Sequence, residues 1–223
     1  MSSGLSLGRD EARALGAFCR RHAMWSPTSA ARVVGSGSSL GVFATPPWEV
    51  MTFAAIPAGI SVDGIDVNVS MSALADSLES GQPLDVDSLP RVHVPASKGL
   101  TLLNLPPREG WQMPISGISG DIAQVVDAEY QQVRQQTSGL SPRDTDLAVR
   151  TWWTQQGWSG LTMGVLYAAQ QLGMLPKDRS KISAATCGPW KRLSTSRGQV
   201  FSYGAGQGGA LSLAVLDVTK PGR

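Results

Sequence analysis

The apolar residues of this chain recur first with the spacing of a helix and soon afterwards with the spacing of strands. Residues 9–24 carry one largely apolar stripe at intervals of three and four, which predicts an N-terminal helix. Residues 30–70 alternate with a period close to two and are interrupted by Gly-Ser and Asp-Gly turns, which predicts antiparallel strands. A short helix is expected over residues 72–78. The N-terminal half is therefore expected to be a small antiparallel sheet with a helix.

The middle of the chain interrupts these patterns. Residues 82–117 are rich in proline and turn residues, which indicates either a linker or an irregular crossing between two halves. We place a domain boundary here, dividing the chain into residues 1–110 and 111–223. The same pattern also fits a single domain, and this alternative stays open.

Three helices are predicted after the boundary. The first covers residues 120–136 with one mostly apolar face. The second begins at Ser141, because a serine cap, Pro142 in the first helical position and Asp144 three residues after the serine form a capping box. The third starts after residue 159 and ends at Leu172, ahead of a glycine and a proline.

Two strands, residues 181–187 and 190–203, follow the three helices as a basic hairpin, and residues 210–218 (ALSLAVLDV) are expected to add one more strand. Three helices followed by a hairpin are the order of a winged helix-turn-helix. The fold class is therefore predicted to be α+β, with three helices and a winged-helix-like β-hairpin in the C-terminal half.

The same C-terminal segments resemble a known group of proteins. The stretch GLTMGVLYAAQQLGMLPKDRSKISAATCGPWKRLSTSRGQVF, with PPREGWQ and the helix DIAQVVDAEYQQV before it, is similar to an uncharacterised family of actinobacterial proteins of about this length. In that family a similar helix ends in a Gly-x-Leu turn, and a Trp-x-Arg-Leu strand and a Gly-x-Val-aromatic strand follow. These are packing and turn residues. The resemblance implies a shared fold and an intracellular, actinobacterial setting, and it assigns no site residues.

Composition and charge narrow the class of protein. With 42% hydrophobic residues, 16% charged residues and a net charge of +2, the chain is globular rather than disordered. Charge is unevenly placed: residues 61–130 hold three basic and ten acidic side chains, whereas residues 131–223 hold eleven basic and four acidic ones. The beginning of the chain lacks a signal-peptide pattern and no apolar run is long enough to span a bilayer. We expect a cytoplasmic protein with reduced thiols and no membrane partner.

Two glycine-rich segments match catalytic or cofactor patterns only superficially. Residues 37–41 (GSSLG) fit the Gly-x-Ser-x-Gly pattern of a nucleophile elbow, and residues 204–209 (GAGQGG) resemble a dinucleotide loop. Both patterns need a helix immediately afterwards. The residues that follow read as extended chain in each case, so both segments are interpreted as turns.

The chain also has few residues that could bind a metal ion. Cys19, His22, His93 and Cys187 are the only cysteines and histidines, and they lack the paired spacing of a structural zinc site. The paired aspartates are assigned to turns and helix caps. We therefore predict no catalytic residue, no metal site and no cofactor, and an enzymatic role is left open without being favoured.

The basic hairpin is the strongest functional signal. Residues 177–197 carry six basic side chains against one acidic one, with aromatic residues among them, a combination that suits phosphate contacts and base stacking. The helix before the hairpin contains no lysine or arginine, which argues against reading of base edges. The candidate contacts with a partner or a nucleic acid are Lys181, Trp190, Lys191, Arg192, Arg197 and Tyr203.

These observations favour a non-catalytic intracellular binding or scaffolding protein that acts through protein–protein contacts, with a protein partner or as a homodimer. The alternative is a winged-helix-like nucleic-acid-binding protein that uses the basic hairpin at residues 177–204. The least favoured hypothesis is an enzyme with a small substrate between the two halves.

Overall fold

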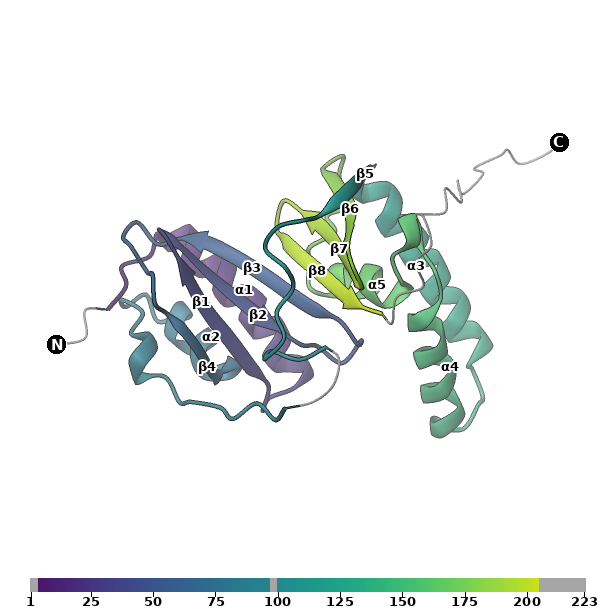
Figure 1. Cartoon of the computed structure of the whole chain (residues 1–223). Helices are drawn as coiled ribbons and strands as arrows, with labels where there is room; N and C mark the ends of the chain where they lie inside the picture. Colours follow the sequence, from purple (N-terminus) through teal and green to yellow (C-terminus); the bar gives the residue numbers. More distant parts are fainter. Residues whose placement is uncertain (1–3, 97–99, 205–223) are drawn as a thin grey trace.

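The strands of the protein form one continuous antiparallel sheet. The computed structural model describes residues 4–96 and 100–204, so the strand expected at residues 210–218 lies outside the described part. The strands are β1 (Ala30–Ser36), β2 (Ser39–Ala44), β3 (Met51–Pro57), β4 (Asp66–Ser70), β5 (Gln112–Ile118), β6 (Lys181–Cys187), β7 (Trp190–Thr195) and β8 (Gly198–Tyr203). Their order across the eight-stranded sheet is β4-β1-β2-β3-β8-β7-β6-β5, so β3 and β8 meet in the middle (Figure 1).

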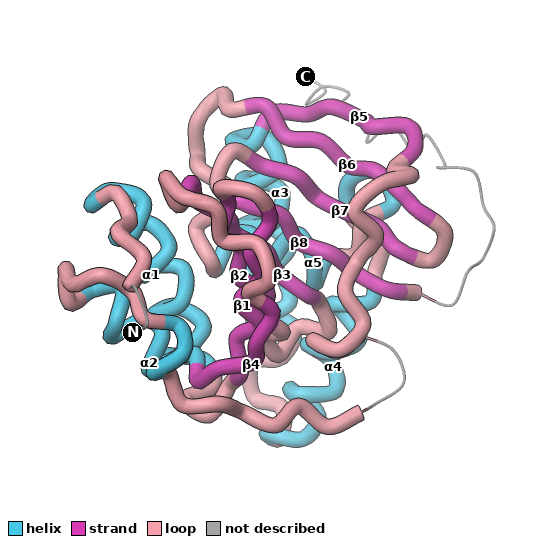
Figure 2. The backbone as a smooth tube through the Cα atoms, turned by 60° about the vertical axis from the view of Figure 1, so that its left-hand side comes forward, coloured by secondary structure: helices cyan, strands magenta, loops and turns pink. Residues whose placement is uncertain are grey.

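The helices lie on one face of this sheet. They are α1 (Arg9–Trp25), α2 (Met71–Glu79), α3 (Ser119–Gln136), α4 (Pro142–Thr154) and α5 (Met163–Gln171), with short 3-10 helices η1 (Val86–Ser88) and η2 (Trp158–Gly160). In Figure 2, α1 and α2 cover the strands of the N-terminal half, and α3 and α5 cover those of the C-terminal half. The connection between the halves crosses the opposite face, which we call the helix-free face.

Several predicted elements are confirmed, and local capping explains why. The helix expected over residues 9–24 is α1. The capping box predicted at Ser141 starts α4: the serine Oγ accepts the Asp144 N–H at 3.2 Å, and Pro142 is the first helical residue. Ser70 caps α2 in the same way, accepting the Ala73 N–H at 3.3 Å. These signals depend only on neighbouring residues.

The predicted small sheet and the winged-helix-like C-terminal half are both wrong. The strand expected over residues 190–203 turns at residues 196–197 and is two strands, β7 and β8. β8 pairs with β3, Met51 lying opposite Phe201, and so joins the hairpin to the N-terminal sheet. The physical reason is burial on both faces: Val200 packs in the core under the helices, and Phe201 is buried on the helix-free face. A wing covered on one face only would not provide this burial.

The structure also contains β5, within the proline-rich connection for which the sequence predicts no strand. Pro114 lies within it, and the register with β6 shifts between Gln112 and Ile115. A proline and a bulge both interrupt the alternation that identifies a strand. As the last strand of the order, β5 lies where a proline in a sheet is tolerated. The boundary at residue 110 stays a prediction.

One hydrophobic core extends under both halves of the sheet. It contains residues from α1 and α2 as well as from α3 and α5. Trp48, 3% exposed, lies between the halves: its ring centroid is 5.1 Å from that of Trp25 and 5.7 Å from that of Tyr167 in α5. Edge-to-face contacts of this kind add to the area buried by each ring. Trp48 therefore fastens the N-terminal half to α5.

Replacing Trp48 tests how much its packing between the two halves stabilises the protein. We expect Trp48→Ala to lower the free energy of unfolding by about 3–5 kcal/mol, the usual cost of truncating a buried aromatic residue. Trp25→Ala is the matched control, and its loss should be clearly smaller because Trp25 is 47% exposed. Urea unfolding measures both. Equal losses would contradict a central packing role for Trp48.

A buried histidine lies at the contact between α1 and β3. His22 is 3% exposed, packs against the ring of Phe18 and has its Nε2 2.9 Å from Oγ1 of Thr52. Burial removes the imidazolium from water and lowers the pKa of His22 to about 3. The predicted apolar stripe therefore contains a neutral histidine that belongs to the core.

This burial makes the protein sensitive to acid. The folded-state pKa lies below the unfolded value of about 6.5, so the unfolded chain binds a proton first. The stability that depends on a neutral His22 is fully present above pH 6.5 and is lost as the pH falls toward 3. From pH 7 to pH 4.5, the wild type should lose roughly 2–3 kcal/mol more than His22→Gln. Urea unfolding at the two pH values checks this, and parallel losses would refute it.

Candidate binding groove

A groove lies where the two halves of the molecule meet. It is a cavity of about 550 Å³ between α1 and the C-terminal end of α5, above the junction of β3 and β8. Its walls include the buried side chains of Leu15 and Phe18 from α1, Ile56 from β3, and Leu172 and Met174 after α5. Cavities of about 300–1,000 Å³ with mostly apolar walls are typical ligand sites. The groove therefore has the size and lining to hold apolar side chains.

One wall of the groove is an unpaired strand edge. β2 pairs with β3 as far as Pro57, but β8 pairs with β3 only from Met51 to Phe53. The pairing ends at Gly198, whose φ is +147° and whose Cβ, if present, would lie 2.5 Å from the carbonyl oxygen of Phe53. Within residues 4–96 and 100–204, no strand continues the sheet beside residues 54–57 on this side. Because Ala54 and Ile56 bond to β2, the groups open to an additional strand are the N–H and C=O of Ala55 and the C=O of Pro57.

Two arginines form the rim of the groove at the end of α5. Arg21 Nη1 donates to the carbonyl oxygen of Leu172 at 2.6 Å, and Arg197 Nη1 donates to that of Gly173 at 3.0 Å. Carbonyl groups at a helix C-terminus lack intrahelical donors and carry partial negative charge, so both contacts are favourable. Neither arginine forms an ion pair with any described residue. The rim therefore stays positively charged.

The six contact residues predicted from the hairpin do not form one surface. Lys181 is exposed at the start of β6. Lys191 points toward the helices, where its Nζ donates to the carbonyl oxygen of Gly160 at 2.6 Å. Arg197 is in the turn between β7 and β8, at the groove. The hairpin is therefore not a continuous basic wing.

The other three predicted residues do come together, on the helix-free face. Trp190 and Tyr203 are opposite each other in β7 and β8, with ring centroids 5.0 Å apart. Arg192 lies over the ring of Trp111, its Cζ 4.3 Å from the ring centroid. Trp111, in the segment PPREGWQ, is a further residue of this surface that the sequence pattern does not single out. The groove residues of α1 belong to the apolar stripe from which the sequence predicts burial in a core, and nothing in that stripe indicates a groove.

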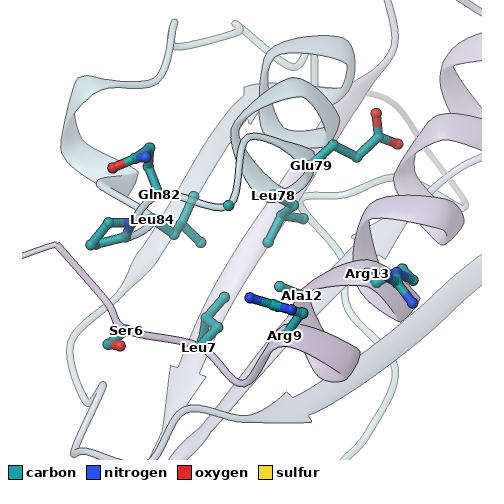
Figure 3. A pocket seen from close by; sticks show the side chains of 11 residues that line it. Ser6, Leu7, Arg9, Ala12, Arg13, Leu78, Glu79, Gln82 and Leu84 are labelled. Carbon is teal, nitrogen blue, oxygen red and sulfur yellow. The ribbon is translucent and has the colours of Figure 1, made fainter.

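A second cavity opens at the start of α1. It has a volume of about 590 Å³ and lies between the N-terminal segment, α1 and the end of α2. Leu7, Leu78 and Leu84 line it together with Arg9 and Arg13 of α1 (Figure 3). None of the six contact residues predicted from the sequence lines this cavity.

The segment GSSLG and the two cysteines have structural places, whereas residues 205–209 of the segment GAGQGG lie outside the described residues. Residues 37–41 form the β1–β2 turn and the start of β2, with Gly37 at a φ of +56°. Cys19 is buried in α1, and Cys187 lies in β6. Among the described residues, no three His, Cys, Asp or Glu side chains are grouped so that they could hold a metal ion. No helix in the described part of the chain is long and apolar enough to cross a membrane.

The contact between Arg21 and α5 can be tested by stability. Arg21→Leu leaves the Leu172 carbonyl oxygen without its charged donor, and we expect a loss of about 1–3 kcal/mol in the free energy of unfolding. Arg13→Leu, in the same helix and without a hydrogen bond to a described residue, should change it by less than about 0.5 kcal/mol. Urea unfolding at pH 7 compares them. An Arg21→Leu variant with an unchanged free energy of unfolding would contradict a stabilising role for this hydrogen bond.

Family models cover most of the chain. Residues 1–98 match a domain of unknown function (DUF8010), and residues 106–207 match another domain of unknown function (DUF8185). Among curated proteins, no sequence matches the chain. The two domain matches agree with the uncharacterised family expected from the sequence.

Several solved structures with a similar fold are bacterial sliding clamps. They include DNA polymerase III beta of Caulobacter crescentus (TM-score 0.54, 12% identity), which is matched over 90% of this chain and 65% of that one. The DNA polymerase III beta subunit of Thermotoga maritima (0.53, 10%) is matched over 88% and 63%, and the sliding clamp of Bartonella birtlesii bound to griselimycin (0.51, 12%) over 86% and 63%. The chain thus spans less than two thirds of these proteins, and at such identities the likeness shows the fold alone. The chain therefore matches two domains of unknown function, DUF8010 and DUF8185, on a fold similar to that of bacterial sliding clamps.

Proposed function

We propose that this protein is a non-catalytic intracellular scaffold that binds an extended segment of a partner protein in the groove between its halves. The observation that carries the proposal is the unpaired edge of β3 at residues 54–57, which lies inside an apolar groove. An isolated edge favours strand addition, and an apolar groove favours side-chain burial. Their coincidence favours a peptide over a small metabolite.

The recognition mode follows from the geometry. A peptide added to a sheet edge gains main-chain hydrogen bonds, and pockets for alternate side chains give specificity. Apolar side chains of the segment would pack against Phe18 and Met174. An acidic side chain would meet Arg21 or Arg197 at the rim, where guanidinium N–H groups beyond those donated to α5 are available. The expected ligand is an extended segment with apolar residues and at least one carboxylate.

The sliding clamps are described as subunits of DNA polymerase, which supports a scaffold that works at DNA. Nucleic acid is a second partner in this proposal, and its binding does not depend on a winged helix. Duplex DNA binding that weakens as salt rises would support it. A second copy of the chain is an alternative occupant of the groove, and light scattering at several concentrations identifies a dimer.

A variant that fills the groove tests the proposal. Ala14 is exposed on α1 and lines the groove, so Ala14→Trp should reduce partner binding at least tenfold through steric block. Ala128→Trp, on the exposed surface of α3, is the matched control and should bind normally. Proteins captured by the wild type from a lysate of the source organism are identified and purified, and their affinities for the three proteins are compared.

Hydrogen exchange supplies the second measurement. Binding by strand addition should slow amide exchange at Ala55, whose N–H faces the open side and would enter a new ladder, whereas the N–H groups of Ala54 and Ile56 already face β2 and should change little. If every purified partner binds the two tryptophan variants equally, or leaves amide exchange at Ala55 unchanged, the groove is not the binding site.

A further inference from the structure

Arg192 has a positive charge that no described residue neutralises. Its side chain is partly buried in β7, on the helix-free face. No carboxylate of a described residue lies within ion-pair distance, and its Nε is buried without a hydrogen-bond partner. Desolvation by burial lowers the pKa of Arg192 from its ordinary value. A partly buried guanidinium without an anion is costly to maintain, so its retention calls for an explanation.

A loop holds an aromatic ring beneath this arginine. Trp111 Nε1 donates to the carbonyl oxygen of Pro107 at 2.9 Å, which closes the loop 107–111 on itself. Gly110, with a φ of +80°, provides the turn, and Cys187 Sγ donates to the carbonyl oxygen of Glu109 at 3.6 Å. The guanidinium carbon then lies 4.3 Å above the indole ring. The ring fixes the plane of the guanidinium and leaves the N–H groups at its edge without a hydrogen-bond partner among the described residues.

Tyr203 extends the same surface. It is 41% exposed and lies against Trp190, which is 5% exposed. Arginine, tryptophan and tyrosine are the residues most enriched at the energetic centres of protein interfaces. Rigid aromatic rings beside an oriented guanidinium thus provide both apolar area and a directed charge.

The geometry favours a carboxylate over a nucleic acid. One face of Trp111 is covered by Arg192, and Trp190 is buried, so neither indole offers an open face for a base. Lys191 and Arg197 donate to carbonyl groups elsewhere, and Lys181 lies four residues along β6 from Ala185, the partner of Arg192. The phosphate groups of a nucleic acid strand would therefore meet a single cation, Arg192, at this position. A single planar guanidinium fits one carboxylate with two parallel hydrogen bonds.

We propose that Arg192, Trp111 and Tyr203 form a second docking surface, on the face opposite the groove, which binds an aspartate or glutamate of an acidic partner segment flanked by apolar residues. The carboxylate pairs with the edge of Arg192, and the flanking side chains pack against Trp111 and Tyr203. Charge complementarity selects this occupant, because the C-terminal part of the chain is basic and Arg192 is its partly buried, unpaired cation.

The probe is the capped peptide acetyl-Gly-Leu-Asp-Leu-Gly-amide, with its Asn counterpart and the oligonucleotide (dT)10 as comparisons. Side-chain NMR of ¹⁵N-labelled full-length protein follows the Arg192 Nε–H and the Trp111 indole N–H during titration. We expect the Asp peptide to shift both signals and the Asn peptide to bind at least tenfold more weakly. Loss of one charge-assisted bidentate pair accounts for that factor.

Variants assign the effect to the arginine. Arg192→Gln should weaken the Asp peptide at least tenfold, and Arg192→Lys should bind with intermediate affinity because it keeps the charge but not the fork. Lys181→Gln, which removes an exposed cation from β6, should change the affinity less than twofold. Unchanged chemical shifts of the core methyl groups show that each variant is folded.

The groove variant Ala14→Trp separates this surface from the proposed function, because it should leave Asp-peptide binding intact. The proposal is overturned by equal binding of the Asp and Asn peptides, by a silent Arg192→Gln variant, by tighter binding of (dT)10 at the same signals, or by no shift at millimolar peptide.

Discussion

The pairing of β3 with β8 is the interaction on which the rest of the structure depends. It consists of three residue pairs, from Met51 opposite Phe201 to Phe53 opposite Gln199. These pairs turn two four-stranded halves into one sheet, and they bring α1 and α5 together on one face. Burial on both faces secures the seam: Thr52 and Val200 are covered by the helical layer, and Met51 and Phe201 pack in the smaller cluster on the other side. The shortness of the pairing also creates the groove, because β3 continues where β8 has already ended.

The elements that the sequence predicted well are those encoded by neighbouring residues. The stripe of α1 and the capping box at Ser141 each lie within a few turns of chain. The seam depends on residues about 150 positions apart, and nothing local to Val200 shows that its strand will join β3. The break between β7 and β8 depends on a turn at residues 196–197, which polar residues of an apparently continuous strand conceal. In the same way, the contact of Trp111 with Arg192 forms only because the loop at residue 110 reaches β7.

Several cationic side chains of this protein bond to backbone carbonyl groups instead of carboxylates. Arg21, Lys191 and Arg197 each donate to a main-chain oxygen of a distant element. The ion pairs among the described residues lie within one half or the other, so attraction between an acidic middle and a basic end does not join the halves. Arg21 to Leu172 is instead a cross-half contact made by a single charge. Against this pattern Arg192 stands apart, since its guanidinium meets an aromatic ring and no oxygen of a described residue.

The short seam also has a mechanical consequence. Three residue pairs resist twisting less than the five or six pairs that join most neighbouring strands, so relative rotation of the halves concentrates there. Such a rotation changes the separation of α1 from the end of α5, and with it the width of the groove. An extended segment lying along β3 would pair with β3 between α1 and the end of α5, and would therefore hold the groove at one width.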